Sequence, residues 1–119
     1  YHLEAGIAYW HTIKDDTNEK WENILQLFNQ LLQMEYSPVA ALNRTYALSK
    51  ARGKEVAIKE AEKLDLRGNY LYFTLLGELY KDINPRKAKE NLDRAYTLAK
   101  TANDKNTILK KLYEIEENS

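Results

Sequence analysis

The sequence predicts an all-α protein of about seven antiparallel helices. Apolar residues recur at helical spacing along most of the 119 residues, and no segment alternates strictly for more than a few residues. The four glycines and two prolines lie near predicted helix boundaries, with Gly6 and Gly77 as the exceptions. A chain of this length can bury a substantial core, so we expect residues 1–119 to form a single helical domain.

Two continuous apolar stripes predict the first two helices. Leu3, Ile7, Trp10 and Ile13 predict a helix over residues 2–14, which ends in the turn-forming segment 15–18. The longest stripe predicts a helix over residues 19–35 and consists of Trp21, Ile24, Leu25, Phe28, Leu31 and Leu32.

A capping residue followed by proline marks the start of the third and sixth helices. The Ser37 hydroxyl can accept a hydrogen bond from a free amide of the first turn, and Pro38 at the first helical position loses no bond. The third helix is therefore predicted from Pro38 to about residue 51. Asn84 and Pro85 repeat this arrangement, and the sixth helix is predicted to continue to about residue 99 and to be closed by residues 103–104.

Glycine and asparagine separate the remaining helices. Gly53 precedes a short fourth helix ending near residue 64, the pair Gly68 and Asn69 precedes a fifth over residues 72–80, and a seventh lies around residues 108–115. Gly77 falls inside the fifth helix, where glycine costs about 1 kcal/mol relative to alanine. It is expected there only if the backbone of a partner helix comes close.

The fifth and sixth helices resemble a tetratricopeptide repeat. The first helix of that pattern is matched by Phe73, Leu76, Gly77 and Tyr80, and the second by Ala88, Leu92 and Ala95, although the segment between them is one residue short. Ala57, Ala61 and Leu64 form a weaker copy. This resemblance implies a short right-handed array whose terminal helices act as caps.

Composition argues against several classes of partner. The 18 Lys and Arg residues balance the 18 Asp and Glu residues, so we expect no direct nucleic-acid binding. The longest uncharged stretch is well short of the roughly 20 residues of a membrane-spanning helix, so we expect no membrane partner. There is no cysteine, which is compatible with a reducing compartment, and we expect a cytoplasmic monomer.

No pattern of catalytic or cofactor-binding residues is recognised. His2 and His11 are about 180° apart on one predicted helix and cannot face one metal ion together. The acidic segment 15–19 lacks the glycine and the closing glutamate of a calcium loop. There is no glycine-rich phosphate loop and no nucleophile elbow, so we expect neither an enzyme nor a bound cofactor.

A more specific resemblance covers almost the whole chain. Its segments are Tyr1 to Ala5 with Ile7, Ala8 and His11; Trp21 with Ile24 to Leu32; Ser37-Pro38-Val39, Ala41 to Arg44 and Ala47; and the later Tyr70 to Leu79, Ala95 to Ala99 and Leu109 to Leu112. Together they resemble the C-terminal extension of one group of extracytoplasmic-function sigma factors. In that family the extension is tetratricopeptide-like and follows two sigma domains that bind core polymerase and promoter DNA. Those domains are absent here.

The resemblance implies a protein-interaction domain that regulates a sigma factor or its RNA polymerase complex. The chain is then a fragment of a longer sigma factor, as a start at Tyr1 favours, or a separate companion protein. One alternative is a tetratricopeptide-like scaffold for an unrelated peptide or protein, and another is an enzyme or a small-ligand sensor.

Four residues are candidates for partner binding, namely Arg44, Tyr9, Tyr46 and Tyr70. Tyr9, Tyr46 and Tyr70 are candidates for the groove of the helical array, whereas Tyr72 and Tyr80 are expected in the core.

Asn43 and Arg44 form a polar pair among small and apolar neighbours. Asn43 is expected to bond a carbonyl or loop amide of an adjacent helix. Arg44 either pairs with a carboxylate such as Glu4 or Glu78 or faces a partner at the groove.

Overall fold

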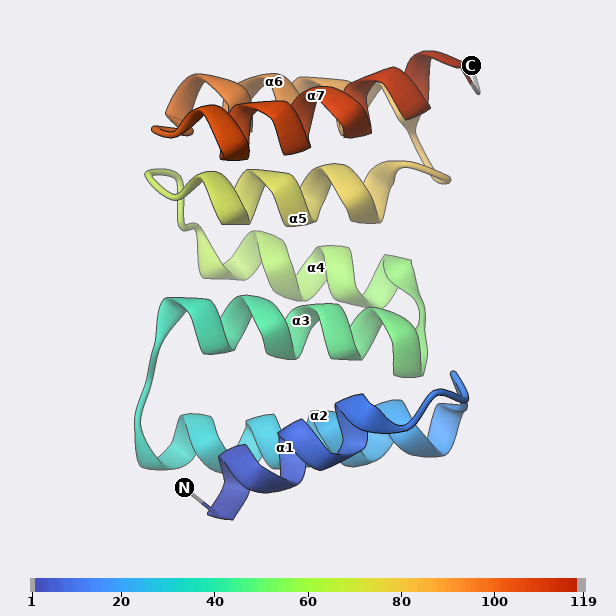
Figure 1. Cartoon of the computed structure of the whole chain (residues 1–119), viewed down its shortest axis with the longest axis vertical. Helices are drawn as coiled ribbons and strands as arrows, with labels where there is room; N and C mark the ends of the chain where they lie inside the picture. Colours follow the sequence, from blue (N-terminus) through green and yellow to red (C-terminus); the bar gives the residue numbers. More distant parts are fainter. Residues whose placement is uncertain (1, 118–119) are drawn as a thin grey trace. The chain divides into compact units, whose positions relative to one another are not determined.

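The computed structural model describes residues 2–117, and the side chains of residues 3–116. Tyr1 and the side chain of His2 lie outside the described residues. Every regular element in this range is a helix (Figure 1), which confirms the all-α prediction. The helices are α1 (His2–Thr12), α2 (Asn18–Met34), α3 (Pro38–Arg52), α4 (Lys54–Leu64), α5 (Tyr70–Tyr80), α6 (Pro85–Leu98) and α7 (Ala102–Glu117).

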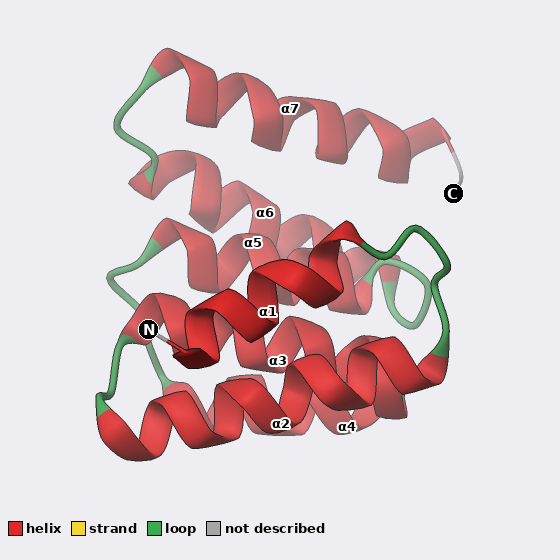
Figure 2. Cartoon of the chain, turned by 60° about the horizontal axis from the view of Figure 1, so that its bottom comes forward, coloured by secondary structure: helices red, strands yellow, loops and turns green. Residues whose placement is uncertain are grey.

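Short loops join successive helices, as Figure 2 shows. The predicted caps begin α3 and α6: the Ser37 hydroxyl accepts from the amide of Ala40, and the Asn84 side chain accepts from the amide of Lys87. Gly53 ends α3 with a φ of 101°, a conformation that favours glycine.

One predicted boundary is wrong. Asn103 and Asp104 do not close the sixth helix but lie in the first turn of α7. The physical reason is a cap at Thr101, whose hydroxyl accepts a hydrogen bond from the Asp104 amide at 3.1 Å. The last helix therefore begins several residues earlier than its apolar stripe alone indicates.

The chain forms two compact units, Tyr1–Glu60 and Ala61–Ser119, which divide within α4. In the first unit α2 packs against both α1 and α3, and its residues Ile24 and Leu25 are fully buried. In the second unit α6 packs against α5 and α7, around the buried side chains of Leu92 and Ile108. The right-handed sense of the predicted array stays a prediction. Within residues 2–117, no helix combines the length and apolar character needed to cross a membrane.

Gly77 lies where α5 meets α6. A Cβ atom at Gly77 would lie 2.5 Å from the Cγ atom of Leu92 and 3.3 Å from the carbonyl oxygen of Ala88. The close approach of a partner helix that the sequence predicts is therefore confirmed. Tyr72 and Tyr80 are also buried in this unit, as expected from their repeat positions.

Arg52 ties the end of α3 to the start of α2. Its Nε and Nη2 atoms donate to the two carboxylate oxygens of Glu22 at 3.0 and 3.3 Å. The hydrogen bond from Arg52 lowers the pKa of Glu22 below its usual value, outweighing the opposite effect of burial.

We expect Gly77→Ala to lower the free energy of unfolding. Overpacking at a buried position costs about 1 to 3 kcal/mol, whereas the better helix propensity of alanine returns about 1 kcal/mol. Urea unfolding measures the difference. Gly68→Ala is the matched control, because a Cβ atom there meets nothing within 4 Å. A Gly77→Ala protein at least as stable as the parent would contradict the close approach.

We expect Glu22→Gln to make stability less sensitive to acid. A carboxyl with a depressed pKa in the folded state stabilises the fold above its unfolded pKa, and this stabilisation is lost as the pH falls through the folded pKa. The parent should therefore melt above the variant near neutral pH, and the gap should close on acidification below about pH 4. Glu19→Gln, at an exposed glutamate of the same helix, serves as the control. A gap that is constant across this range would be inconsistent with the ion pair.

Candidate functional site

The first unit contains an open hollow of about 400 Å³ over α2, between α1 and α3. Its lining consists of Glu4, Ile7, Ala8, His11, Trp21, Ile24, Phe28, Leu31, Asn43, Tyr46 and Ala47. The floor is apolar and mostly buried, whereas Glu4, His11, Asn43 and Tyr46 at the rim are exposed.

Helical periodicity places these residues together. Helix α2 presents Ile24, Phe28 and Leu31 to the hollow at spacings of four and three residues, so they follow one face of the helix. In α1 the same spacing brings Glu4, Ala8 and His11 to one side. Asn43, Tyr46 and Ala47 form the wall from α3.

Trp21 joins all three helices at one end of the hollow. Its side chain is only 7% exposed. The ring of His11 from α1 meets it edge-on at 5.9 Å between centroids, and the ring of Tyr46 from α3 does so at 5.7 Å. The indole Nε1 atom donates to the Asp16 carboxylate, so the polar edge of this buried ring is satisfied.

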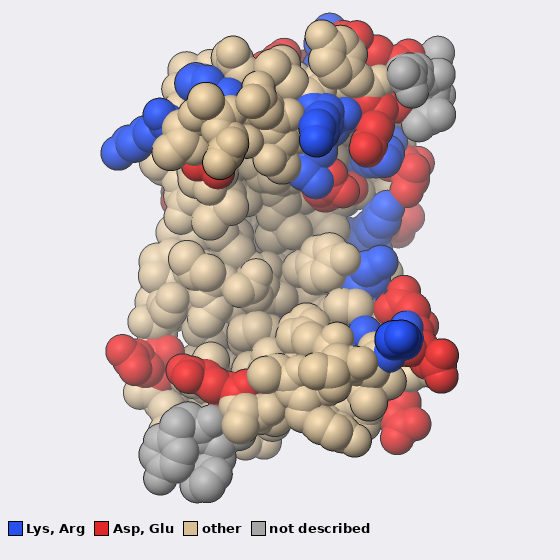
Figure 3. Space-filling model, in the orientation of Figure 1, with Lys and Arg blue, Asp and Glu red and all other residues tan. Residues whose placement is uncertain are grey.

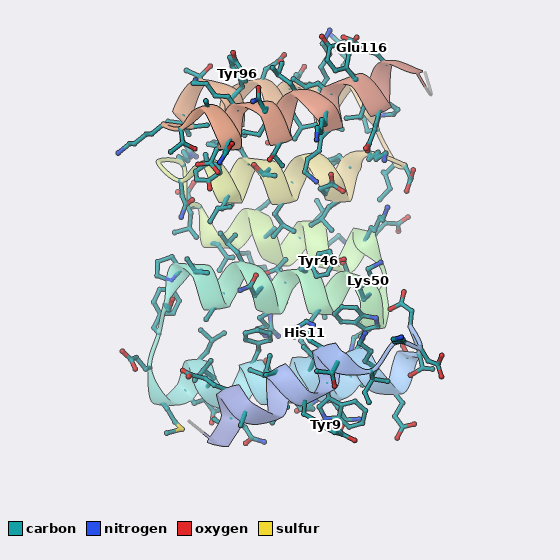
Figure 4. All side chains as sticks on the ribbon, in the orientation of Figure 1. Tyr9, His11, Tyr46, Lys50, Tyr96 and Glu116 are labelled. Carbon is teal, nitrogen blue, oxygen red and sulfur yellow. The ribbon has the colours of Figure 1, made fainter. Side chains whose placement is uncertain are left out.

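Two lysines support the same end. The Lys20 Nζ atom donates to the Ile13 carbonyl at 2.7 Å and lies 5.0 Å from the Trp21 ring centroid, which fastens the loop between α1 and α2. Lys50 lies 5.7 Å from the Tyr46 ring centroid and 4.0 Å from Asp16. Figure 4 shows Tyr46 and Lys50 side by side on α3.

The charge around the hollow is one-sided. Glu4 is the single charged side chain in the lining, which includes no Lys or Arg. Gly6 faces Leu27 and His11 faces Trp21, so α1 runs antiparallel to α2 and Glu4 lies toward the Leu31 end. In Figure 3 the surface over α1 to α3 is mostly uncharged at its centre, with charged atoms at its two ends. The exposed rim therefore carries one negative charge, at the Glu4 end, which favours a cation there.

The structure brings only one of the predicted groove tyrosines to the hollow. Tyr46 lines it and is 41% exposed. Tyr9 is 59% exposed but points to the opposite side of α1 from His11 (Figure 4). Tyr70 belongs to the second unit, where burial first, and then a hydrogen bond with Asp104, raise the pKa of its hydroxyl.

Arg44 is half-buried outside the lining of the hollow. Its Nε atom donates to the Asn29 side-chain oxygen at 2.5 Å and ties α3 to α2. The expected pairing with Glu4 or Glu78 is wrong in both cases: the partner is an amide, and Glu78 instead accepts from Lys111 at 2.7 Å. An amide partner suffices because a half-buried guanidinium can still reach water with its other nitrogen atoms.

Asn43 differs from its prediction. We expected a hydrogen bond from its side chain to an adjacent helix, but Asn43 is exposed at the rim of the hollow, and no such bond joins it to another described residue. The reason is helical phase: Asn43 shares the exposed side of α3 with Tyr46 and Lys50, three and seven residues later. The buried face carries Ala41, Leu42, Thr45, Ala47 and Leu48.

Sequence reasoning missed the contribution of α1. Ile7, Ala8 and His11 line the hollow beside Glu4, yet none of them was a candidate for binding. The sequence did contain a signal for this site. Glu4, Ala8 and His11 lie on the same helix face as the apolar Ile7, and a polar or small residue on an otherwise apolar face can mark a surface.

Comparison with known proteins finds one relative of unstated function. A protein of Rhizobium meliloti (strain 1021), described as uncharacterized, is 35% identical over 108 residues, which cover 87% of this chain and 26% of the relative. The chain thus spans about a quarter of the length of the curated relative it matches. No protein-family model matches the chain, and no solved structure matches it.

We expect Arg44→Ala and Asn29→Ala each to lower the free energy of unfolding by about 1 kcal/mol, the usual net worth of one hydrogen bond. The double variant should cost less than the sum of the two, because both remove the same bond. Urea unfolding of the four proteins measures this coupling. An Arg44→Ala protein that melts like the parent but loses partner binding would instead give Arg44 a role at a partner surface.

Proposed function

We propose that this chain is a protein-interaction domain that regulates an extracytoplasmic-function sigma factor or its RNA polymerase complex in transcription initiation. The partner is a protein, namely a sigma-factor domain or a polymerase subunit. The hollow between α1, α2 and α3 is the binding site.

One observation carries this proposal. Every residue that lines the hollow, except Tyr46, belongs to the segments that resemble the sigma-factor extension. Those segments come from three separate helices, and the fold brings them to one surface.

Core packing explains only some of the residues that both line the hollow and belong to the resembling segments. Ile24 and Phe28 are buried, so any helical domain would need apolar residues there. Glu4, Ala8 and Asn43 are exposed, so the core does not require them. Exposed positions that match the resembling segments without serving the core are suited to recognition of a partner.

The length of the relative is consistent with a domain that works as part of a larger protein. About three quarters of the Rhizobium meliloti protein lies outside the aligned segment. A domain of this kind can act on other domains of the same chain or on another chain. When the partner is in the same chain, a short linker raises its effective concentration.

Binding to purified sigma-factor domains and to core polymerase from the same bacterium tests the proposal. We expect micromolar or tighter binding of at least one of them, measured by biolayer interferometry. Ala8→Trp, which places a large ring in the hollow, should weaken this binding by about tenfold or more, a loss typical of a central interface position.

Tyr9→Trp is the control. Tyr9 is exposed, lies outside the lining and points to the opposite side of α1 from His11. We expect it to bind like the parent, and circular dichroism should report the same helix content for both variants. Absence of binding to every sigma and polymerase component would contradict the proposed function, and equal weakening by both variants would contradict the site.

A further inference from the structure

We propose that the second unit carries a binding site for an acidic side chain, Asp or Glu, of a partner protein. The site is an open pocket of about 280 Å³, here called the arginine pocket, and it is lined by Arg67, Phe73, Arg94, Thr97 and Leu98. It belongs to the other unit from the hollow, so the proposal goes beyond the proposed function and rests on it only in taking the partner to be a protein. Two cations that line one pocket, and the balance of charge around them, carry the proposal.

Arg94 presents a guanidinium group that no carboxylate occupies. Its side chain is exposed on α6, and among the described side chains no ion pair engages it. The Cζ atom lies 5.7 Å from the ring centroid of Phe73, a buried residue of α5. Contact with this ring restrains the guanidinium group and leaves its N–H groups free to bind an anion. One such arginine would not define a ligand, but the pocket contains two.

Arg67 comes from the loop between α4 and α5, and local bonds hold this loop in shape. The Arg67 Nε atom donates to the Asp65 carboxylate at 2.6 Å, and the Asn69 amide donates to the Leu66 carbonyl at 3.0 Å, which closes a turn over Arg67. Asp65 has a φ of 49°, in the left-handed region that aspartate adopts more readily than most residues. Within the described part of the chain, Arg67 uses only its Nε atom in a hydrogen bond, so both Nη atoms remain as donors for a ligand.

The balance of charge favours a single carboxylate as the ligand. The lining contains two positive side chains and no Asp or Glu. Asp65 lies outside the lining but is bonded to Arg67, so it offsets one of the two positive charges. The remaining positive charge matches the carboxylate of Asp or Glu, whereas a phosphoryl dianion would leave an excess of negative charge.

The walls of the pocket fit the hydrocarbon part of an acidic side chain. Leu98 is half-buried, and the stems of Arg67 and Arg94 are chains of methylene groups. Thr97 adds no donor, because its hydroxyl already donates to the Asp93 carbonyl at 3.1 Å. The guanidinium groups therefore recognise the anion, and their paired N–H groups match the two oxygens of a carboxylate.

NMR titration with short peptides tests this proposal. The probe is a peptide blocked at both ends, with one Glu between two Leu residues, so that its only charge is the Glu carboxylate. A second peptide carries Gln in place of Glu, and a third carries phosphoserine. The Nε–H signals of Arg67 and Arg94 report binding at the pocket itself. We expect the Glu peptide to shift both signals, with a Kd on the order of a millimolar at low salt, the phosphoserine peptide to bind no more tightly, and the Gln peptide to shift neither signal.

Arg94→Gln should weaken binding of the Glu peptide by about threefold to tenfold, because it removes one of the two cations that meet the carboxylate. Lys110→Gln is the matched control, since it removes the same charge at an exposed position of α7 outside the lining. It should bind the Glu peptide like the parent. The Arg67 signal reports binding in both variants, and circular dichroism checks that both keep the helix content of the parent.

Asp65→Asn tests the charge balance separately. Asparagine also adopts the left-handed region readily, so the loop is retained while one negative charge is removed. The pocket then contains two cations without a compensating carboxylate. We expect the phosphoserine peptide to gain about threefold or more in affinity relative to the Glu peptide.

Four results would overturn the proposal: unchanged Arg67 and Arg94 signals with the Glu peptide, equal binding of the Gln peptide, tighter binding of the phosphoserine peptide to the parent, or equal effects of Arg94→Gln and Lys110→Gln. An unchanged peptide preference in Asp65→Asn would overturn the charge balance on which the choice of a carboxylate rests. These outcomes are separate from the sigma-factor test. Selective binding of the Glu peptide together with no binding to sigma or polymerase would retire the proposed function alone. Binding to polymerase with unchanged arginine signals would retire the arginine pocket alone.

Discussion

The architecture of the candidate site depends on the buried ring of Trp21. This one side chain contacts an aromatic ring from α1 and another from α3, and its nitrogen is bonded to the loop between α1 and α2. Large aromatic side chains dominate packing energies because they bury extensive area, and edge-on ring pairs add to that. The indole therefore fixes the positions of α1 and α3 on α2 near residue 21. The hollow is the space between α1 and α3 from there toward Leu31.

Two polar side-chain pairs hold α3 against α2. Arg44 bonds to Asn29 and Arg52 to Glu22, and both pairs connect α3 to α2 outside the hollow. Neither pair uses a residue of the lining, so the position of α3 on α2 does not depend on the residues of the hollow. Under the proposed function, a wall held in this way loses little conformational freedom on binding.

The second unit follows a different principle, close backbone approach. Gly77 lets α5 and α6 meet around Leu92, and α7 then adds both buried Ile108 and polar links to α5, such as Lys111 with Glu78. Tyr70 of α5 belongs to these links through its hydrogen bond with Asp104 of α7, and its role in partner binding stays a prediction. Tyrosine suits either role, because its ring is apolar and its hydroxyl is not.

Local rules in the sequence determined the helices and most of their ends. The spacing of apolar residues predicts each helix, and the Ser37-Pro38 and Asn84-Pro85 pairs predict two starts, because periodicity and capping act between residues a few positions apart. The start of α7 was missed because a threonine cap carries a weaker signal than a proline. Tertiary structure alone decided the site. Whether Asn43 is bonded or exposed, whether Arg44 meets a carboxylate or Asn29, and whether Ala8 faces a hollow depend on how residues far apart in the chain meet, and no local spacing encodes that register.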